Sequence, residues 1–253
     1  MAGRLQGRVA LVTGAASGFG AGIARRFAGE GASVVVADID DDAGREVIEE
    51  IAAAGGAASY RHADVGIAGD VKDMVAHAQA AFGGLDILVN NAGWAYSNRP
   101  STEVPEADFD RLFATNVKSV YLATREAVPL LRRQGGVMLN VASTAAARPR
   151  PNLTWYNATK GALVTITRSL ALELAPDRIR VCAINPVIGE TGLTSTFMGV
   201  PDTPENRAPF LATIPLGRFS TPADIANAAL FLASDEAAFL TGVCLDVDGG
   251  RSV

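Results

Sequence analysis

An apolar run that ends abruptly in glycines constrains the fold of this chain more than any other stretch. It reads VALVTGAASGFG at residues 9–20 and contains Gly14, Gly18 and Gly20. Such a run is typical of a buried strand, and residues 21–28 after it have the pattern of a helix. The bare N–H groups of the turn and the helix dipole suit a phosphate or pyrophosphate. The spacing T-G-x-x-x-G-x-G departs from G-x-G-x-x-G, so the motif alone also fits a plain strand-to-helix turn.

Strands and helices alternate along the rest of the chain. We expect further strands at 33–38, 57–61, 86–91, 137–143, 180–185 and 244–247, and helices at about 41–54, 67–82, 105–133 and 154–174. The long third helix should be interrupted near Asn116. This alternation predicts a parallel, doubly wound α/β sheet, and 253 residues fit one domain, 1–253. The insert at about 188–213, rich in Thr, Pro and Gly, is expected to act as a substrate lid.

Composition and charge argue against several classes of protein. The net charge of −5 disfavours nucleic acid or an anionic membrane as a partner. Cys182 and Cys244 stand in apolar runs and are expected to be core residues rather than a disulfide. His62 and His77 stand apart without metal-ligand spacing, and His77 is expected to be solvated. With no secretory signal and no apolar run of about 18 residues, we expect a soluble cytoplasmic protein.

An acidic residue, Asp38, ends the second strand about 20 residues beyond the glycine turn. Dinucleotide folds place their ribose carboxylate there, where it accepts hydrogen bonds from both hydroxyls and repels a 2′-phosphate. Asp38 therefore favours NAD over NADP, while the acids at 40–42 suit the first turn of a helix. Because open α/β sheets bind ligands beyond the carboxyl ends of their strands, Gly14, Asp38, Asn91 and Ser143 should converge on one crevice.

Tyr156 and Lys160 are four residues apart on a predicted helix and so share one face. Tyrosine, with a pKa near 10, is a poor base at neutral pH. A neighbouring ammonium can lower that pKa by roughly 1–3 units, toward the range useful for acid–base catalysis. Ser143 supplies a hydroxyl that could hold a substrate oxygen. By itself, the Tyr–Lys spacing is more typical of an ordinary surface pair, because such spacing is frequent on helices.

Four motifs in register change that interpretation. They are TGAASGFG at 13–20, NNAG at 90–93, a serine thirteen residues before the tyrosine, and YNATK at 156–160. In this combination the chain resembles the classical short-chain dehydrogenase/reductase family over essentially its full length. The resemblance implies a single Rossmann-type domain with a seven-stranded parallel sheet. It also implies hydride transfer between NAD(P) and an alcohol or carbonyl carbon.

The resemblance assigns roles to individual residues. Tyr156 would be the catalytic acid/base, Lys160 would lower its pKa and hold the nicotinamide ribose, and Ser143 would orient the substrate oxygen. Asn116 would support a proton-relay water. The implied cofactor-binding residues, besides Tyr156 and Lys160, are Gly14, Ser17, Gly18, Phe19, Gly20, Asp38, Ile39, Asp64, Val65, Asn91, Ala92, Gly93, Pro186, Ile188 and Thr191.

The chain departs from the family pattern at three places. Val187 follows Pro186 where glycine is usual, which puts the backbone contacts there in doubt, and Thr159 and Cys182 replace a common serine and asparagine. The ending LDVDGG at 245–250 resembles that of members that form tetramers. Helices 109–133 and 154–174 also carry surplus apolar side chains, among them Leu163, Ile166 and Leu170. We therefore expect a homotetramer, with a dimer as the alternative.

The leading function is that of an NAD-dependent dehydrogenase for a secondary alcohol, sugar or polyol, or of a ketone reductase. One alternative is a 3-oxoacyl-carrier-protein reductase, which generally goes with NADPH and basic residues near the second strand. Another is a non-catalytic dinucleotide sensor, which tends to lose the Ser–Tyr–Lys set. Arg148 and Arg150 could hold an anionic group or be solvated loop residues. The expected pocket side chains are mostly apolar: Trp94, Tyr96, Ala145, Pro149, Trp155, Leu193, Phe197 and Met198.

Overall fold

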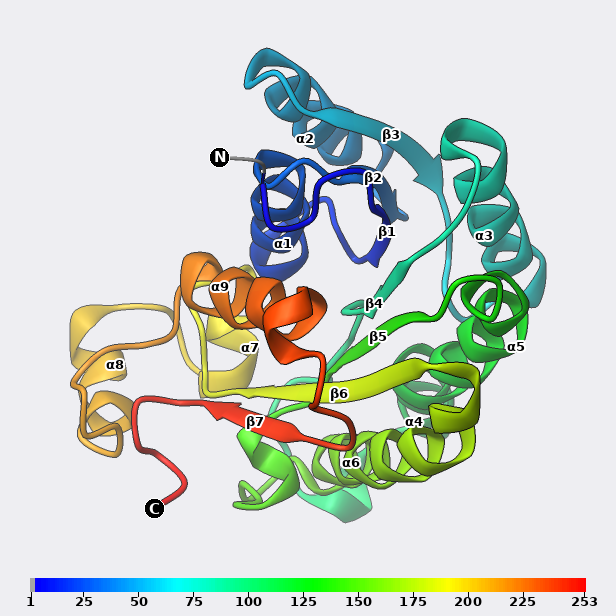
Figure 1. The fold of residues 1–253 in the computed structure, drawn as a ribbon. Helices are drawn as coiled ribbons and strands as arrows, with labels where there is room; N and C mark the ends of the chain where they lie inside the picture. The colour runs from blue at the N-terminus through cyan, green and yellow to red at the C-terminus, as the bar shows by residue number, and fades with distance from the viewer. Residues whose placement is uncertain (1–2) are drawn as a thin grey trace.

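A parallel sheet is the frame of the molecule, which a computed structural model describes for residues 3–253. Within these residues, seven strands form one sheet in the order β3-β2-β1-β4-β5-β6-β7 (Figure 1). The strands are β1 (Val9–Thr13), β2 (Ser33–Asp38), β3 (Ala57–His62), β4 (Ile87–Asn90), β5 (Gly136–Val141), β6 (Ile179–Pro186) and β7 (Cys244–Val247). The predicted Rossmann-type, doubly wound α/β fold with seven parallel strands is confirmed.

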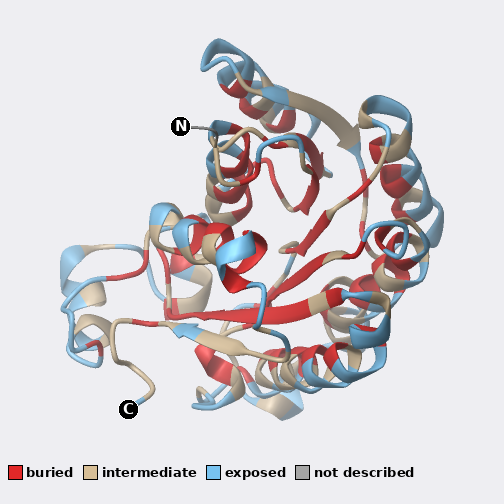
Figure 2. Cartoon of the chain, viewed as in Figure 1, coloured by how far each residue is buried: buried red, intermediate tan, exposed pale blue. Residues whose placement is uncertain are grey.

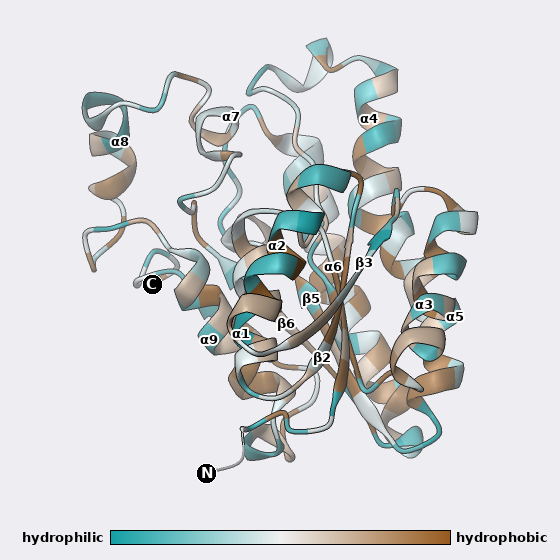
Figure 3. Cartoon of the chain, turned by 90° about the horizontal axis from the view of Figure 1, so that it is seen from above, coloured by the Kyte–Doolittle hydropathy of each residue, from teal (hydrophilic) through white to brown (hydrophobic). Residues whose placement is uncertain are grey.

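Helices cover both faces of this sheet (Figure 3). The α-helices of the described residues are α1 (Gly18–Gly29), α2 (Asp41–Ala53), α3 (Ala68–Phe82), α4 (Glu106–Phe113), α5 (Ser119–Leu131), α6 (Thr154–Leu174), α7 (Thr194–Met198), α8 (Pro204–Leu211) and α9 (Pro222–Ala233). Side chains of α1, α2 and α9 form the core on one face. Those of α3, α5 and α6 form it on the other.

The continuous apolar strands of the sequence follow from this three-layer arrangement. Ala10 and Val12 of β1 pack into one core and Leu11 between them packs into the other, and all three are fully buried. Alternate residues of a strand point to opposite faces, so a strand covered on both sides must be apolar at every position. Figure 2 shows the resulting band of buried residues through the central strands.

The chain changes direction across the sheet at β1, which pairs with β2 on one side and β4 on the other. It runs outward from β1 through β2 to β3, returns to β4, and then runs outward again to β7. Such a switch point leaves a crevice beyond the carboxyl ends of the strands, because the connections on the two sides diverge there. The fold therefore places the glycine turn after β1 at the edge of a natural ligand site.

One expected detail is confirmed, and two elements differ from the sequence-based expectation. The interruption expected near Asn116 is confirmed as a π-helical turn, η2 (Ala114–Lys118), between α4 and α5. The insert 188–213 contains two short helices, α7 and α8, rather than an unstructured loop. Helix α9 was not expected at all; it packs on the α1 side of the sheet.

The two cysteines and His77 lie outside the crevice, and the structure tests what the sequence predicted for them. Cys182 is buried and Cys244 is half-buried, and both are free thiols, as predicted. The expectation that His77 is simply solvated is wrong, because its Nε2 lies 2.8 Å from Ser59 Oγ and burial lowers its pKa. In the described part of the chain, no helix is long and apolar enough to cross a bilayer, and no cluster of three metal-ligating side chains occurs.

Candidate active site

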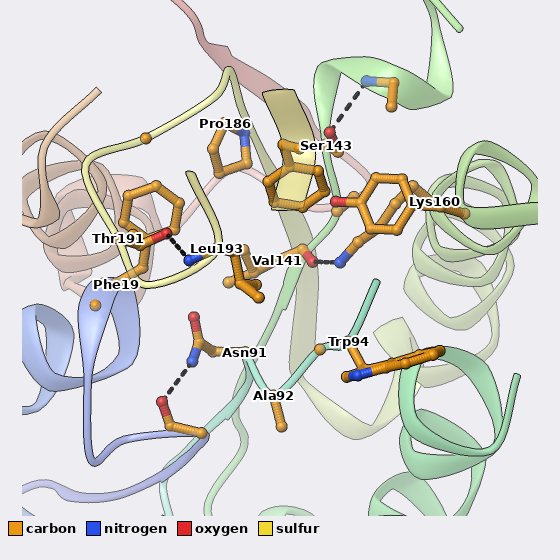
Figure 4. Close-up of a pocket in the computed structure, with 18 of the residues that line it drawn as sticks. Phe19, Asn91, Ala92, Trp94, Val141, Ser143, Lys160, Pro186, Thr191 and Leu193 are labelled. Carbon is orange, nitrogen blue, oxygen red and sulfur yellow. Dashed lines mark hydrogen bonds between the residues drawn. The ribbon is translucent and has the colours of Figure 1, made fainter. Parts of the chain in front are cut away.

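A cavity of about 880 Å³ opens where the strands end, in the upper part of the size range of small-molecule and cofactor sites. Among the predicted catalytic residues, Ser143, Tyr156 and Lys160 line it, but Asn116 does not. The predicted cofactor residues that line it are Gly14, Ser17, Gly18, Phe19, Asp38, Ile39, Asp64, Val65, Asn91, Ala92, Gly93, Pro186, Ile188 and Thr191. In the view of Figure 4, Phe19, Thr191 and Leu193 lie on one side, and Ser143, Lys160 and Trp94 on the other.

The glycine turn after β1 leaves no room for side chains. Gly14 has a φ of +61°, and a Cβ there would lie 2.8 Å from the Cα of Ala92. Gly20 does not line the cavity, because it packs beneath the turn, where a Cβ would lie 2.1 Å from the carbonyl oxygen of Gly14. Gly14 thus permits the conformation of the turn, and Gly20 permits α1 to approach it closely.

Asn91 and Asp38 hold the turn from two sides. Asn91 Nδ2 donates to the carbonyl oxygens of Thr13, at 2.8 Å, and Gly14, at 3.0 Å, so it joins the ends of β4 and β1 (Figure 4). Asp38 Oδ2 accepts from Ala16 N at 2.9 Å, and its Oδ1 accepts from Ile39 N and Asp40 N. The predicted ribose carboxylate is therefore fixed by backbone groups and lies on the wall of the cavity.

Asp64 also receives backbone hydrogen bonds at the cavity wall. Its Oδ1 accepts from Gly66 N at 2.8 Å, and its own N–H donates to Asp70 Oδ2 at 3.0 Å. These bonds hold the loop after β3, including Val65, against the same cavity. Ile39, at the end of β2, is 60% exposed on the rim. An apolar side chain so exposed beside Asp38 offers a surface for a flat ring.

Ser143, Tyr156 and Lys160 come together from β5 and α6. Tyr156 is 7% exposed and Lys160 is 5% exposed, and the Lys160 Nζ lies 5.7 Å from the centre of the Tyr156 ring. Nζ donates to the carbonyl oxygen of Val141 at 2.8 Å (Figure 4). Ser143 Oγ accepts from Ala145 N at 3.1 Å. The Ser143 hydroxyl hydrogen therefore remains available for another acceptor.

The pKa of Tyr156 moves in the direction opposite to the sequence-based expectation. Burial raises it to about 12, while the Ser143 hydroxyl and the Arg150 charge act in the lowering direction. Burial also lowers the pKa of Lys160 to about 8. The expected lowering of the tyrosine pKa by Lys160 is not found, because desolvation of the phenolate outweighs the neighbouring groups. At neutral pH the phenol of Tyr156 is therefore protonated and able to donate its proton.

Asn116 lies in the π-helical turn, behind the cavity wall. Its Oδ1 accepts from Trp94 N at 2.8 Å, and its Nδ2 donates to Trp94 O at 3.0 Å and to Thr159 Oγ1 at 3.1 Å. The side chain thus ties the loop after β4 to α6 and fixes the backbone of Trp94, which lines the cavity. Its predicted part in a proton relay stays a prediction.

The segment after β6 shows how the chain accommodates its unusual valine. Val187 is buried among Met198, Ile214 and Phe219, and its φ is not positive. The backbone there does not need glycine, and the side chain instead anchors the following segment. Thr191 Oγ1 accepts from Leu193 N at 3.3 Å (Figure 4).

The part of the cavity beyond Ser143 and Tyr156 is mainly apolar. Of the side chains expected there, Trp94, Ala145, Pro149, Leu193 and Phe197 line it, together with Arg148 and Arg150. Tyr96, Trp155 and Met198 do not line it, because they pack into neighbouring apolar clusters. The lining residues that sequence reasoning missed include the larger side chains Arg111, Phe210 and Arg251. Arg111 carries a partial signal, since it lies on the predicted helix that precedes Asn116.

Comparison with known proteins gives matches along nearly the whole chain. A family model described as enoyl-(acyl carrier protein) reductase matches residues 14–252. The chain is 52% identical over 250 residues to 4-formylbenzenesulfonate dehydrogenase of Comamonas testosteroni, covering 98% of this chain and 99% of that protein. It is 40% identical to 2,5-dichloro-2,5-cyclohexadiene-1,4-diol dehydrogenase of Sphingobium indicum, covering 100% and 99%.

A solved structure is also similar to this chain along nearly its whole length. The 3-ketoacyl-(acyl-carrier-protein) reductase from Brucella melitensis, complexed with NADH, superimposes with a TM-score of 0.92 at 49% identity. The match covers 98% of this chain and 100% of that one. A likeness this extensive covers the glycine turn, the Ser–Tyr–Lys set and the insert before β7 together.

Proposed function

This chain belongs to the classical short-chain dehydrogenase/reductase family, and we propose that it transfers hydride between NAD and an alcohol or carbonyl carbon of a small substrate. One observation carries the proposal: Ser143, Tyr156 and Lys160 face a single cavity that also runs over the glycine turn and Asp38. Substrate and dinucleotide would share this cavity, which is what hydride transfer between them requires. The same set argues against a non-catalytic sensor.

The reacting oxygen would lie between the Ser143 and Tyr156 hydroxyls. Bound NAD supplies or accepts the hydride at the neighbouring carbon. In reduction, Ser143 donates a hydrogen bond to the carbonyl oxygen while Tyr156 Oη gives that oxygen its proton, so that an alcohol forms. This step would leave Tyr156 as a phenolate, which water must reprotonate before the next reduction. In oxidation Tyr156 would start as the phenolate and take the proton from the alcohol oxygen. The raised pKa of Tyr156 suits the proton-donating role at neutral pH.

Lys160 would act on both partners of this reaction. The ammonium group of Lys160 has three N–H donors, and one of them binds the carbonyl oxygen of Val141. The other donors could bind the hydroxyls of the nicotinamide ribose. Its charge would also stabilise a transient phenolate on Tyr156, whose ring centre lies 5.7 Å away.

Asp38 supports a preference for NAD over NADP. Its carboxylate lies on the cavity wall and is held by Ala16, Ile39 and Asp40 backbone N–H groups. Oδ1 already accepts two of these bonds, and Oδ2 accepts one and keeps acceptor capacity for a ribose hydroxyl. A 2′-phosphate at the same place would meet a fixed negative charge, and no basic side chain adjoins Asp38 in sequence to offset it.

We also propose that the insert 188–213 is a lid over the substrate. Leu193, Phe197 and Phe210 from this insert line the cavity, and Phe197 meets the Tyr156 ring edge-on at 5.1 Å between ring centres. A segment placed this way would exclude water from the reacting carbon.

The test is a screen of alcohols, polyols, aldehydes and ketones with NAD(H) and with NADP(H), followed by the absorbance of the reduced nicotinamide. Turnover with NAD(H) and loss of that turnover in Ser143→Ala would support the proposal. No turnover on any of these classes would contradict it.

The NADH-bound ketoacyl-carrier-protein reductase neighbour favours a second candidate, reduction of a 3-oxoacyl carrier protein. Acetoacetyl carrier protein belongs in the same screen. A kcat/KM for it above that of every free alcohol and ketone would favour this second function.

A further inference from the structure

Three arginines from two distant segments meet at the substrate end of the cavity. Arg148 and Arg150 follow the short helix η3 (Thr144–Ala146), and Arg251 lies in the C-terminal tail; all three line the cavity. The Arg148 side chain donates to the carbonyl oxygen of Arg251, which joins the two segments. Asn157 Nδ2 on α6 donates to the carbonyl oxygen of Arg150 at 2.8 Å. The cluster is thereby fixed to the same helix as Tyr156.

Within residues 3–253 this cluster has no ion-pair partner, although the Asp248 charge acts on Arg251 and raises its pKa against the larger lowering effects. None of the three arginines forms an ion pair within 4.0 Å, whereas Arg207 and Arg218, for example, pair with aspartates. Asp248, the acidic neighbour of Arg251, instead accepts backbone N–H bonds from Gly250 and Ser252 at 2.9 and 2.7 Å.

The three guanidinium groups also act on one another. Burial, and then the Arg251 charge, lowers the pKa of Arg150. Burial, and then the Arg148 charge, lowers the pKa of Arg251. Arg251 Nη1 is buried and has no hydrogen-bond partner in the described structure. Like charges held together with an unpartnered buried donor are unfavourable until an anion joins them.

The wall between this cluster and the catalytic hydroxyls is aromatic and aliphatic. The Arg150 guanidinium lies 4.8 Å from the centre of the Phe210 ring, and Phe197 continues the wall to Tyr156. Leu193 and Trp94 line other parts of the same cavity. A substrate spanning from the hydroxyls to the arginines would therefore have a polar end, an apolar body and a second polar end.

We propose that Arg148, Arg150 and Arg251 bind a carboxylate or sulfonate group of the substrate, whose aromatic or aliphatic body separates that group from the reacting carbon. Planar guanidinium groups match the two or three oxygens of such groups with paired hydrogen bonds. The inference rests on the proposed hydride transfer and specifies its substrate as an anionic aromatic or aliphatic alcohol, aldehyde or ketone.

Matched substrates test the role of charge. The kcat/KM with NADH is compared for 4-acetylbenzoate and the neutral 4-acetylbenzamide, and for 4-formylbenzenesulfonate and the neutral 4-formylbenzenesulfonamide. We expect the wild-type protein to favour the anion in at least one pair. Arg150→Gln and Arg251→Gln should each lower the anion-to-amide ratio by about 10-fold or more, the usual loss with a charge-assisted hydrogen bond. Arg150→Lys should restore part of it.

Arg133→Gln is the control variant, because Arg133 is exposed and donates to Gln79 Oε1 rather than to a carboxylate. It should leave the ratio unchanged. A wild-type protein that uses both amides as well as the anions, with the ratio unmoved in both cavity variants, would overturn the inference while leaving hydride transfer in place.

A calorimetric measurement of 4-methylbenzenesulfonate binding to the NADH complex tests the anion site independently of the proposed hydride transfer. Binding that is weakened about 10-fold or more in Arg150→Gln and Arg251→Gln supports the anion site even if no compound is turned over. In that case the proposed function fails and the site stands. Absence of binding, or binding equal in wild type and both variants, overturns the site.

Discussion

Lys160 is 5% exposed, and burial lowers its pKa from the ordinary 10.5 to about 8. The unfolded chain holds this proton more tightly, so the buried charge destabilises the fold below about pH 8. The penalty fades as the pH rises toward 10.5, where the lysine is neutral in both states. The buried charge of Lys160 therefore lowers the stability of the protein at neutral pH.

Replacing this lysine should reveal that penalty. Lys160→Met should raise the free energy of unfolding at pH 7 by about 1–2 kcal/mol, because it removes a buried charge but keeps the volume. The gain should shrink near pH 10. Urea unfolding at pH 7 and pH 10 measures the difference in free energy of unfolding between variant and wild type. Lys72→Met is the control, because Lys72 is exposed. A stability of Lys160→Met relative to wild type that does not fall between pH 7 and pH 10 would contradict this electrostatic account.

Asp38 governs the choice of cofactor in this account. Asp38→Asn keeps one side-chain oxygen for the Ile39 and Asp40 N–H groups but removes the charge. We expect the NAD-over-NADP ratio of kcat/KM to fall by about 10-fold or more, because repulsion of the 2′-phosphate is relieved. A wild-type preference for NADP(H), or a ratio unaffected by Asp38→Asn, would show that this carboxylate does not select the cofactor.

At the scale of elements, helix α9 begins with a capping box. Thr221 Oγ1 accepts from Asp224 N at 3.3 Å, and Asp224 Oδ2 accepts from Thr221 N at 2.8 Å. Thr221→Ala should lower the free energy of unfolding by about 1 kcal/mol, and Thr221→Ser should retain most of it. Activity should not change, because α9 does not line the cavity. Denaturant unfolding of the three proteins checks the cap, and equal midpoints would contradict it.

Some elements were predictable because their signals are local. The bounds of β2, β7 and α6 agree with the sequence-based ranges, since each is an apolar or amphipathic run with clear ends. Helix α9 was not predicted although its start has local signals, Thr221 as N-cap and Pro222 at the first helical position. By contrast, Arg251 joins Arg148 across 103 residues, and only the folded path of the tail reveals that contact.

For the site, the identity of the residues was predictable from the sequence, but the pKa of Tyr156 was not. Motif spacing identified Ser143, Tyr156 and Lys160, which the fold brings to one cavity. The direction of the Tyr156 pKa shift was predicted wrongly, because it depends on how far burial outweighs a charge. Sequence separation on a helix gives proximity between side chains, but it does not give their exposure to water.

At the scale of the whole molecule, the outer face of α4, α5 and α6 has an apolar groove. It is lined by Phe113, Val117, Tyr121, Ile166 and Leu170, among others, and Tyr121 is 60% exposed. The surplus leucine expected at 163 is not part of it, because Leu163 is buried within its own subunit. Exposed apolar surface of this kind is typical of an interface.

We therefore keep the expectation of a homotetramer, with a dimer as the alternative. Light scattering at micromolar concentration should give the mass of four chains, and Ile166→Glu should reduce it, because a charge would be buried in the contact. Lys72→Met, on a different helix, should leave the mass unchanged. A monomeric mass for the wild-type protein would contradict the expectation.

The Tyr156→Phe variant tests directly whether the Tyr156 hydroxyl carries the proton to and from the substrate oxygen. The variant keeps the ring and its edge-on contact with Phe197 but removes the hydroxyl. With the best substrate from the screen, kcat/KM should fall by at least about 10²-fold, the usual contribution of a general acid or base. The dissociation constant of NADH should change by no more than about 2-fold, which shows that the site remains intact. Near-normal turnover in Tyr156→Phe would contradict the account, because another group would then carry the proton.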